Sequence, residues 1–315
     1  MLNDMSMHKL RSKIVLFHRS YKRFTGGHMK VLDYFQHTKI TKGYDPSIYV
    51  TPDSIADHPW NREPSVVSCY DPEQADVLFV AGTDWSALSK YEKIEEKIPV
   101  INLIQGIRHA APDTELYNYL DRKATRICVS DEVRRALEAT QQCNGPLLTI
   151  QNGINLQALP RAKSLPEVDI FIAGVKQPQL AKVLDALLNS RGYKIDCQTE
   201  HIPRSKFLLR MASSRIVVAL PVRMEGFFLP PLEAMAMGRT VVCPDCIGNR
   251  SFCIDGVTAL MPKPDAQAIE EQIIRIDSDP SLEAQMRTNG KNISARFDLH
   301  AERAAFQKIL KQVAK

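Results

Sequence analysis

The stretch Leu220–Cys243, LPVRMEGFFLPPLEAMAMGRTVVC, decides how the rest of the chain is interpreted. It continues from Ser214–Leu220 (SRIVVAL), a short apolar and β-branched run of the kind that forms a buried parallel strand. The proline pair Pro230-Pro231 suits the first turn of a helix, where a missing backbone N–H costs little. The stretch therefore predicts a strand, a loop, a helix and a second buried strand, Thr240–Cys243.

Two carboxylates bracket this predicted loop. Glu225 lies in the loop and Glu233 lies in the first turn of the helix, with seven residues between them. In an open α/β sheet, such loops lie at the carboxyl ends of the strands, where ligands bind. An ionised carboxylate accepts hydrogen bonds from two adjacent hydroxyls, as on a ribose or a sugar ring. The alternative is a structural one, because a helix macrodipole alone favours Glu near an N-terminus by about 0.3 to 1 kcal/mol.

The segment Glu225–Gly238, EGFFLPPLEAMAMG, resembles the E-x7-E signature of retaining GT-B glycosyltransferases of the group 1 type (family 4-like), usually EGFGLPxLEAMAxGxPVV. The resemblance implies an α/β fold of two doubly wound parallel-sheet (Rossmann-like) domains facing across a cleft. It also implies that Glu233 holds the ribose of a nucleotide-sugar donor and that Glu225 faces the donor sugar. Backbone N–H groups near the sugar and phosphates would come from Gly226, Phe227, Phe228 and Leu229. Phe228 replaces a family glycine and narrows the pocket, so the donor stays open.

Length and composition fit this class. A chain of 315 residues suggests about two domains. An apolar share of 44% and a charged share of 24% are typical of a soluble globular protein. No run of about 18 apolar residues that could span a bilayer is present, and the first residues lack the apolar region of a signal peptide. We therefore expect a cytoplasmic protein.

The cysteines indicate reduced thiols rather than a disulfide framework. Seven cysteines, an odd number, are spread through apolar segments. Cys243, Cys246 and Cys253 cluster, but no CxxC partner for Cys243 and Cys246 and no nearby histidine pair completes a zinc site. We expect no metal and no cofactor other than the nucleoside diphosphate sugar, which is a substrate.

The formal net charge of +5 is modest, but basic residues gather near the N-terminus. Such a cluster is either a solvated face or a contact for an anionic acceptor, a nucleotide diphosphate or an acidic membrane surface. The last of these would place the protein at the inner face of a membrane. The sequence carries no nucleic-acid motif, so nucleic acid is not expected as a partner. The basic residues in question are Lys9, Arg11, Lys13, Arg19, Lys22 and Arg23.

The first half of the chain alternates strands and helices, which predicts a parallel sheet. Lys13–Phe17 is its first strand, and Gly26 and Gly27 follow in a loop before a helix that begins at about His28. In the family that the chain resembles, a glycine pair here borders the donor diphosphate and the acceptor. His109, at the carboxyl end of a later strand, is either structural or a proton-handling contact in the acceptor site.

Composition and the resemblance divide the chain into an acceptor-side domain at 1–155, a linker at 156–167 and a donor-side domain at 168–297. The final helix, 298–315, resembles the family helix that crosses back onto the N-terminal domain.

The cations expected to bind the donor diphosphate differ from the family pattern. The family has an Arg soon after the glycine that corresponds to Gly174, whereas this chain has Lys176 in the loop and Lys182 inside the next helix. Lys176 is the better candidate, because a loop lysine at a helix N-terminus reaches a phosphate. Arg250 is a further candidate for binding the donor diphosphate. It belongs to the pair Asn249-Arg250, which stands where the family more commonly has proline-glutamate.

These observations predict retaining, metal-independent transfer of a sugar from a nucleoside diphosphate sugar to a hydroxyl of a saccharide or lipid-linked acceptor, in polysaccharide or glycoconjugate synthesis. Glu225, His109 and Lys176 are the candidate catalytic residues. Because the diphosphate-binding Arg is absent, a GT-B binding or regulatory protein without turnover is the alternative. A sugar-nucleotide epimerase is a third interpretation.

Overall fold

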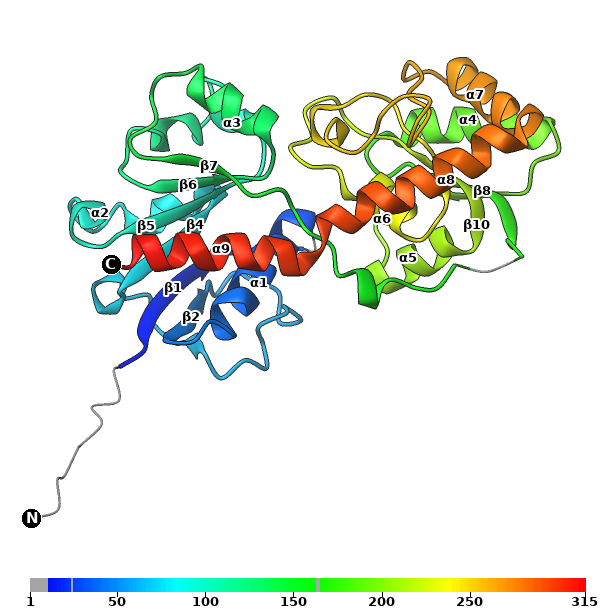
Figure 1. Cartoon of the computed structure of the whole chain (residues 1–315). Coiled ribbons are helices and arrows are strands. Elements are labelled where there is room, and N and C mark those ends of the chain that lie inside the picture. Colours follow the sequence, from blue (N-terminus) through cyan, green and yellow to red (C-terminus); the bar gives the residue numbers. More distant parts are fainter. Residues whose placement is uncertain (1–10, 24, 163–164) are drawn as a thin grey trace, which may run out of the picture. The chain divides into compact units, whose positions relative to one another are not determined.

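The structure is a computed structural model that describes residues 11–23, 25–162 and 165–315. It divides into two compact units. The first contains the described residues up to Cys128 together with Ala136–Ile150 and Arg303–Lys315, and the second contains Val129–Arg135 and Gln151–Glu302. Each unit has its own parallel sheet (Figure 1).

The first unit is built on a seven-stranded sheet in the order β3-β2-β1-β4-β5-β6-β7, and all of its pairings are parallel. The chain starts in the middle at β1, moves outward through β2 and β3, and returns to the other side of β1 at β4. This reversal creates a topological switch point between β1 and β4. The strands are β1 Lys13–Arg19, β2 Tyr44–Val50, β3 Val66–Val67, β4 Val77–Ala81, β5 Val100–Ile104, β6 Thr125–Cys128 and β7 Leu147–Thr149.

Alternation along the central strands of this sheet separates two apolar faces. Phe17 stacks on Phe79, and the helices α1 and α9 cover these rings with Tyr34 and Phe306. On the other face, Leu16, Leu78 and Val80 pack with the segment that follows β4. The helices of this unit are α1 Gly26–Lys39, α2 Ile94–Lys97 and the 3₁₀ turns η1 Pro72–Gln74, η2 Gly82–Leu88, η3 Ile107–Ala110 and η4 Tyr117–Tyr119. The helix α3, Asp131–Glu138, is divided, because its residues up to Arg135 group with the second unit and the rest group with the first.

The second unit is built on a four-stranded parallel sheet in the order β11-β10-β8-β9. Its chain reverses direction across the sheet between β8 and β10, which places a second switch point there. Ile170, Ile172, Ile216 and Val218 form one apolar face, whose core also holds Leu184 of α4 and Ile273 of α7. The strands are β8 Val168–Ala173, β9 Ile195–Gln198, β10 Ser214–Ala219 and β11 Thr240–Val242.

The helices of the second unit cover both faces of its sheet, as in a Rossmann-like domain. Phe171, which points to the face opposite Ile170, packs edge-on against Phe207 of α5. The helices are α4 Pro178–Ser190, α5 Arg204–Ala212, α6 Leu229–Ala236, α7 Ala266–Ser278, α8 Pro280–Ser294, α9 Leu299–Val313 and the 3₁₀ turns η5 Leu156–Ala158, η6 Ile247–Asn249 and η7 Ala295–Phe297.

The last helix, α9, belongs to both units. Its first residues, up to Glu302, group with the second unit, and its remainder groups with the first. In the first unit, Phe306 packs edge-on against Tyr34, and Gln307 donates a hydrogen bond to Thr41. The described residues among 156–167, for which the sequence predicts a linker, group with the second unit.

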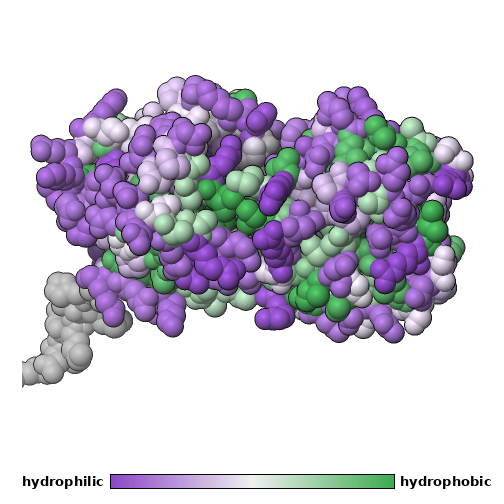
Figure 2. All heavy atoms as spheres, turned by 90° about the horizontal axis from the view of Figure 1, so that it is seen from above, coloured by the Kyte–Doolittle hydropathy of each residue, from purple (hydrophilic) through white to green (hydrophobic). Residues whose placement is uncertain are grey.

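The surface of the described residues is mainly hydrophilic in the view of Figure 2, with hydrophobic residues in small groups between them. Within the described ranges, no helix is both long enough and apolar enough to span a bilayer.

Candidate functional site

The switch point of the second unit brings together the loop after β8 and the loop after β10. Gln177, which ends the first loop, donates its side-chain amide to the Pro221 carbonyl at 2.5 Å in the second. The helix α4 begins immediately after Gln177 with Pro178. The sequence of each loop therefore determines what lies at the carboxyl edge of β8 and β10.

Lys176 and Glu225 meet at this edge. Lys176 Nζ lies 3.0 Å from Glu225 Oε1, and the lysine side chain is 51% exposed while the carboxylate is 17% exposed. Glu225 Oε1 is buried and has no hydrogen-bond partner among the described residues, so its contact with Lys176 is an ion pair without a hydrogen bond. The two residues that the sequence predicts as catalytic in this unit are thus brought together.

Glu233 is buried on α6 and is paired on one oxygen only. Its side chain is 1% exposed, and its Oε1 accepts a hydrogen bond from Arg204, the first residue of α5. The other oxygen, Oε2, is buried and has no hydrogen-bond partner among the described residues. A buried charged oxygen without a partner carries a desolvation cost, which a ligand hydroxyl would remove.

The backbone N–H groups of this site are fewer than the sequence predicts. The helix α6 starts at Leu229, so both Pro230 and Pro231 lie in its first turn and supply no N–H. Phe228 already donates its N–H to the Gly248 carbonyl at 2.9 Å. Of the four residues whose N–H groups the sequence predicts near the donor, Phe228 therefore has its N–H engaged within the chain.

The two phenylalanines of the motif are packing residues. Phe227 is 9% exposed and its ring contacts Phe252 and Phe297, with centroids 5.5 and 5.9 Å away. Phe228 is 5% exposed. A Cβ added at Gly248 would lie 2.6 Å from the Phe227 backbone nitrogen, so only glycine allows this close approach. The motif loop is thus held from behind by the segment after β11.

That supporting segment also contains Arg250 and the clustered cysteines. Arg250 donates two hydrogen bonds to Asp245, at 2.8 and 2.6 Å, so its guanidinium is engaged with its own loop. Cys243, Cys246 and Cys253 are buried free thiols. Among the described residues, no cluster of three or more His, Cys, Asp or Glu side chains is arranged to hold a metal ion.

The switch point of the first unit holds a cavity of about 220 Å³, here named the glycine cavity. It lies where β1, β4 and β5 end and where α1 begins. Gly27 and His109, both predicted from the sequence, line it, whereas Gly26 does not. The lining residues are Arg19, Thr25, Gly27, His28, Gly82, Gln105, Gly106, Arg108, His109 and Leu116.

Gly26 and Gly27 are the first two residues of α1, not loop residues. The helix begins here because Thr25 has an extended backbone and its hydroxyl accepts the N–H of His28 at 3.2 Å. A Cβ at Gly27 would approach the Gln105 side chain at 3.0 Å, and Gln105 donates to the Gly27 carbonyl at 3.2 Å. Gly27 therefore allows close contact between α1 and the segment after β5.

The two histidines of the glycine cavity are neutral near pH 7. Burial, aided by the nearby Arg108 and Arg126, lowers the pKa of His109 to about 4, and burial together with Arg19 lowers the pKa of His28 to about 4. Nδ1 of His28 has no hydrogen-bond partner among the described residues, and the same holds for the two ring nitrogens of His109. Because the lining contains two arginines and no carboxylate, the cavity carries positive charge that does not depend on histidine.

The basic residues near the N-terminus do not form one free face. Lys9 lies outside the described residues. Lys13 donates to the Ala314 carbonyl, Arg19 pairs with Asp84 at 3.2 Å, and Lys22 pairs with Asp53.

Sequence reasoning missed Arg204 and Asp84, and it named Arg19 only as one of the basic residues near the N-terminus. Each reaches its partner only through the fold, and neither composition nor spacing marks them in the chain. The Pro203 before Arg204 signals a helix start but not its contact with a carboxylate on another helix.

The fold of the chain is shared with solved structures. HepE from Anabaena in complex with UDP-glucose has a TM-score of 0.75 at 13% identity, covering 95% of this chain and 100% of that one. Sucrose-phosphate synthase from Thermosynechococcus elongatus has a TM-score of 0.68 at 14% identity, covering 95% and 98%. The lipopolysaccharide outer core galactosyltransferase WaaB has a TM-score of 0.63 at 12% identity, covering 95% and 99%. The chain therefore has a GT-B fold of two Rossmann-like domains.

Residues 154–293, all within the second unit, match the family model of glycosyl transferases group 1. This part of the chain, which contains Lys176, Glu225 and Glu233, is therefore similar to a group 1 glycosyl transferase domain. Comparison with curated protein sequences finds no significant match.

Proposed function

We propose that this protein is a glycosyltransferase that moves a sugar from a nucleoside diphosphate sugar to a hydroxyl group of an acceptor. The observation that carries the proposal is the pairing of Lys176 with Glu225 at the switch point of a unit that matches group 1 glycosyl transferases. HepE, a structural neighbour, was solved with UDP-glucose, so UDP-sugars are the first donors to test.

On the donor side, Glu233 holds the ribose through its buried Oε2. A ribose diol supplies the hydrogen-bond donors that this oxygen lacks, and Arg204 fixes the carboxylate through Oε1 and balances its charge. The N–H groups of Gly226 and Phe227 make no hydrogen bond within the described residues and are available to the donor sugar or phosphate.

During transfer, the bond between the anomeric carbon and the phosphate oxygen breaks, and negative charge builds on the leaving diphosphate. Lys176 leaves Glu225 and binds this diphosphate, since preorganised charge at a developing anion is commonly the largest contribution to catalysis. We assign no metal to this step. Arg250, which is held by Asp245, is not part of the phosphate site.

The proposal includes retention of anomeric configuration by front-face attack. The acceptor oxygen bonds to the anomeric carbon as the phosphate leaves, and a diphosphate oxygen takes the acceptor proton. Glu225 then needs no covalent role, which agrees with its ion pair to Lys176. Anomeric configuration in the isolated product, read from proton couplings, tests this part separately.

On the acceptor side, we propose that the first unit binds a saccharide or lipid-linked acceptor, with the glycine cavity next to the reacting hydroxyl. His109 is neutral there and offers nitrogen atoms without partners among the described residues. A role in polysaccharide or glycoconjugate synthesis in the cytoplasm follows from this acceptor class. Membrane contact through the basic N-terminal residues is not included, because three of them have partners within the first unit.

A second candidate function is a GT-B protein that binds nucleotide sugars without turnover. The observation that favours it is that Lys176 and Arg250 are both engaged by carboxylates in the structure.

The experiment that separates the two combines donor binding with turnover. The full-length protein is incubated with UDP-, GDP-, ADP- and dTDP-sugars and a panel of saccharide acceptors, and nucleoside diphosphate release is followed. Release that requires Lys176 supports the glycosyltransferase. Binding of a donor without release or transfer across the panel would favour the binding protein, and conversion of the donor sugar without an acceptor would indicate an epimerase.

A further inference from the structure

A second cavity in the first unit, of about 370 Å³, lies beside the glycine cavity. We name it the hydroxyl cavity, and its volume falls within the range of small-molecule sites, about 300 to 1,000 Å³. It opens where β1, β2 and β4 end, at the carboxyl edge where ligands bind in parallel sheets. Its lining residues are His18, Ser20, Thr51, Asp53, Tyr70, Thr83, Asp84, Ser86, Ala87, Lys90 and Tyr91.

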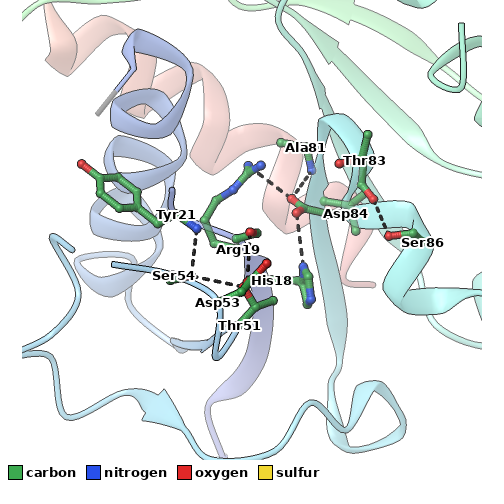
Figure 3. A network of polar contacts seen from close by, with 12 residues as sticks. His18, Arg19, Tyr21, Thr51, Asp53, Ser54, Ala81, Thr83, Asp84 and Ser86 are labelled. Carbon is green, nitrogen blue, oxygen red and sulfur yellow. Dashed lines mark hydrogen bonds and ion pairs between the residues drawn. The ribbon is translucent and has the colours of Figure 1, made fainter. Parts of the chain in front are cut away.

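The ion pair between Arg19 and Asp84 stands between the two cavities. Arg19 lines the glycine cavity and Asp84 lines the hydroxyl cavity. Asp84 is 4% exposed, and its Oδ2 lies 3.2 Å from Arg19 Nη1 and accepts the Ala81 N–H at 2.9 Å (Figure 3). Its charge is therefore neutralised from the side of the glycine cavity.

His18 is held in one orientation by the same carboxylate. Its Nδ1 lies 3.2 Å from Asp84 Oδ1, and an ionised carboxylate can only accept, so Nδ1 carries the proton. The His18 side chain lines the cavity, and its remaining ring nitrogen, Nε2, is an acceptor on the neutral ring and a donor on the imidazolium. A hydroxyl group of a ligand both donates and accepts, so it satisfies Nε2 in either form.

The other polar groups of the lining suit a neutral ligand rich in hydroxyl groups. Asp53 is bound by Lys22, Thr51 and Ser20, and the hydrogen bond from Lys22 is the main reason that its pKa falls to about 2. Both carboxylates are thus balanced by cations, and Lys90 is the lining cation without a carboxylate partner among the described residues. The glycine cavity, by contrast, has two arginines and no carboxylate.

Aromatic rings complete the lining. The rings of His18 and Tyr70 pack edge-on at 4.9 Å, and Tyr91 donates its hydroxyl to the Tyr70 carbonyl at 3.1 Å. Apolar ring surface beside a small set of fixed polar groups is the usual composition of a small-molecule site. A pyranose, with C–H faces and a rim of hydroxyl groups, matches this combination.

We propose that the hydroxyl cavity binds a neutral hexose unit of the acceptor, one that lies next to the unit receiving the transferred sugar. This inference rests on the proposed glycosyltransferase function. It identifies the acceptor as a saccharide of more than one unit rather than a single phosphorylated sugar.

The test measures binding of methyl glucoside, methyl galactoside and methyl mannoside to the full-length protein by saturation-transfer NMR. Ser86 and Thr83 are exposed residues of the lining, so S86Y and T83Y each fill the cavity without disturbing a buried group. Ser89 is exposed, lies in the same segment and does not line the cavity, so S89Y is the matched control. Glucose 6-phosphate and inorganic phosphate serve as anionic probes, and the K90A variant removes the cation without a partner.

We expect at least one methyl hexoside to bind the wild type and S89Y, and to bind S86Y and T83Y about tenfold more weakly or not at all, a loss of about 1.4 kcal/mol. Binding of an anionic probe that depends on Lys90 is recognised by its loss in K90A. Absence of hexoside binding, binding that S86Y and T83Y do not weaken, or binding of the anionic probes alone would overturn the proposal. A thermal-shift measurement of nucleotide-sugar binding to S86Y distinguishes failure of this inference from failure of the proposed function. If a donor still stabilises S86Y, only the acceptor inference has failed. If no donor binds the wild type, the proposed function has failed.

Discussion

The sites of the two units differ in how the chain builds them. In the second unit, Glu225 and Glu233 belong to one continuous stretch, and each meets a cation from a neighbouring segment, Lys176 or Arg204. In the first unit, the glycine and hydroxyl cavities draw on the ends of separate strands, and the Arg19–Asp84 pair stands between them. The two carboxylates of the second unit are thus encoded by one local motif, whereas the cavities of the first unit exist only once the sheet has formed.

Among the variants, Glu233→Ala is expected to have the largest effect on transfer. Removing the carboxylate takes away the ribose acceptor and leaves Arg204 without its partner. Hydrogen bonds to charged groups contribute about 1.5 to 3 kcal/mol each, so transfer should fall by about 100-fold or more. Steady-state kinetics with varied donor concentration measure the loss.

The matched control for this variant is Glu270→Ala. Glu270 is also buried, at 6% exposure, and pairs with Arg191 in the same unit, but it lies on α7. The Glu270→Ala variant should be less stable than the wild type while its donor KM stays unchanged. Equal donor kinetics in the two variants would contradict the role of Glu233.

A smaller effect is expected for Lys176→Ala. The variant loses the charge that binds the leaving diphosphate, so kcat should fall by about 10 to 100-fold with a smaller change in donor KM. Lys182→Ala, an exposed change inside α4, is the control and should have wild-type kinetics. Partial rescue by Lys176→Arg would support a charge effect, and wild-type kcat in Lys176→Ala would remove the lysine from the mechanism.

Gly248→Ala tests the support behind the motif loop. A Cβ there would meet the Phe227 backbone at 2.6 Å, so the loop must shift, at a cost of about 1 to 3 kcal/mol. Urea unfolding measures this loss, and donor KM should rise with it. Gly106→Ala, where a Cβ would meet no atom within 4 Å, should change stability little. Equal stability of the two variants would show that the loop does not depend on close contact at Gly248.

The neutral histidines of the first unit give a pH dependence of stability. The folded pKa of His109, about 4, lies below its ordinary value of 6.5, so the unfolded chain binds more protons between these values. The contribution of His109 to the free energy of unfolding is therefore present above pH 6.5 and is lost as the pH falls toward 4. The loss should reach about 2 kcal/mol by roughly pH 5, measured by urea unfolding. His109→Gln should remove part of this slope, with His28 providing the remainder; an unchanged slope would contradict the assignment.

The smallest effect is expected for Arg250→Ala. Its exposed pair with Asp245 contributes about 0 to 1 kcal/mol, and the proposal gives it no donor contact. Donor KM should change by less than about twofold. A large rise in donor KM would restore Arg250 to the phosphate site.

The sequence predicts β1, β10 and β11 because each is a short apolar run, and it predicts the motif loop because Glu225, Pro230 and Glu233 are close in the chain. It places Gly26 and Gly27 outside the helix, because the capping role of Thr25 depends on a backbone conformation that composition does not specify. It also does not predict the Arg19–Asp84 pair, whose partners come from the ends of two strands that become neighbours only through the parallel pairing of β1 and β4.

The measurement that tests the central claim most directly is a thermal-shift screen of UDP-, GDP-, ADP- and dTDP-sugars against the wild type, Glu233→Ala and Glu270→Ala. The account predicts that one nucleotide class stabilises the wild type and Glu270→Ala, and that this stabilisation is absent in Glu233→Ala. Equal stabilisation of Glu233→Ala by the same donor, or no stabilisation of the wild type by any of the four, would contradict a nucleotide-sugar site built around Glu233.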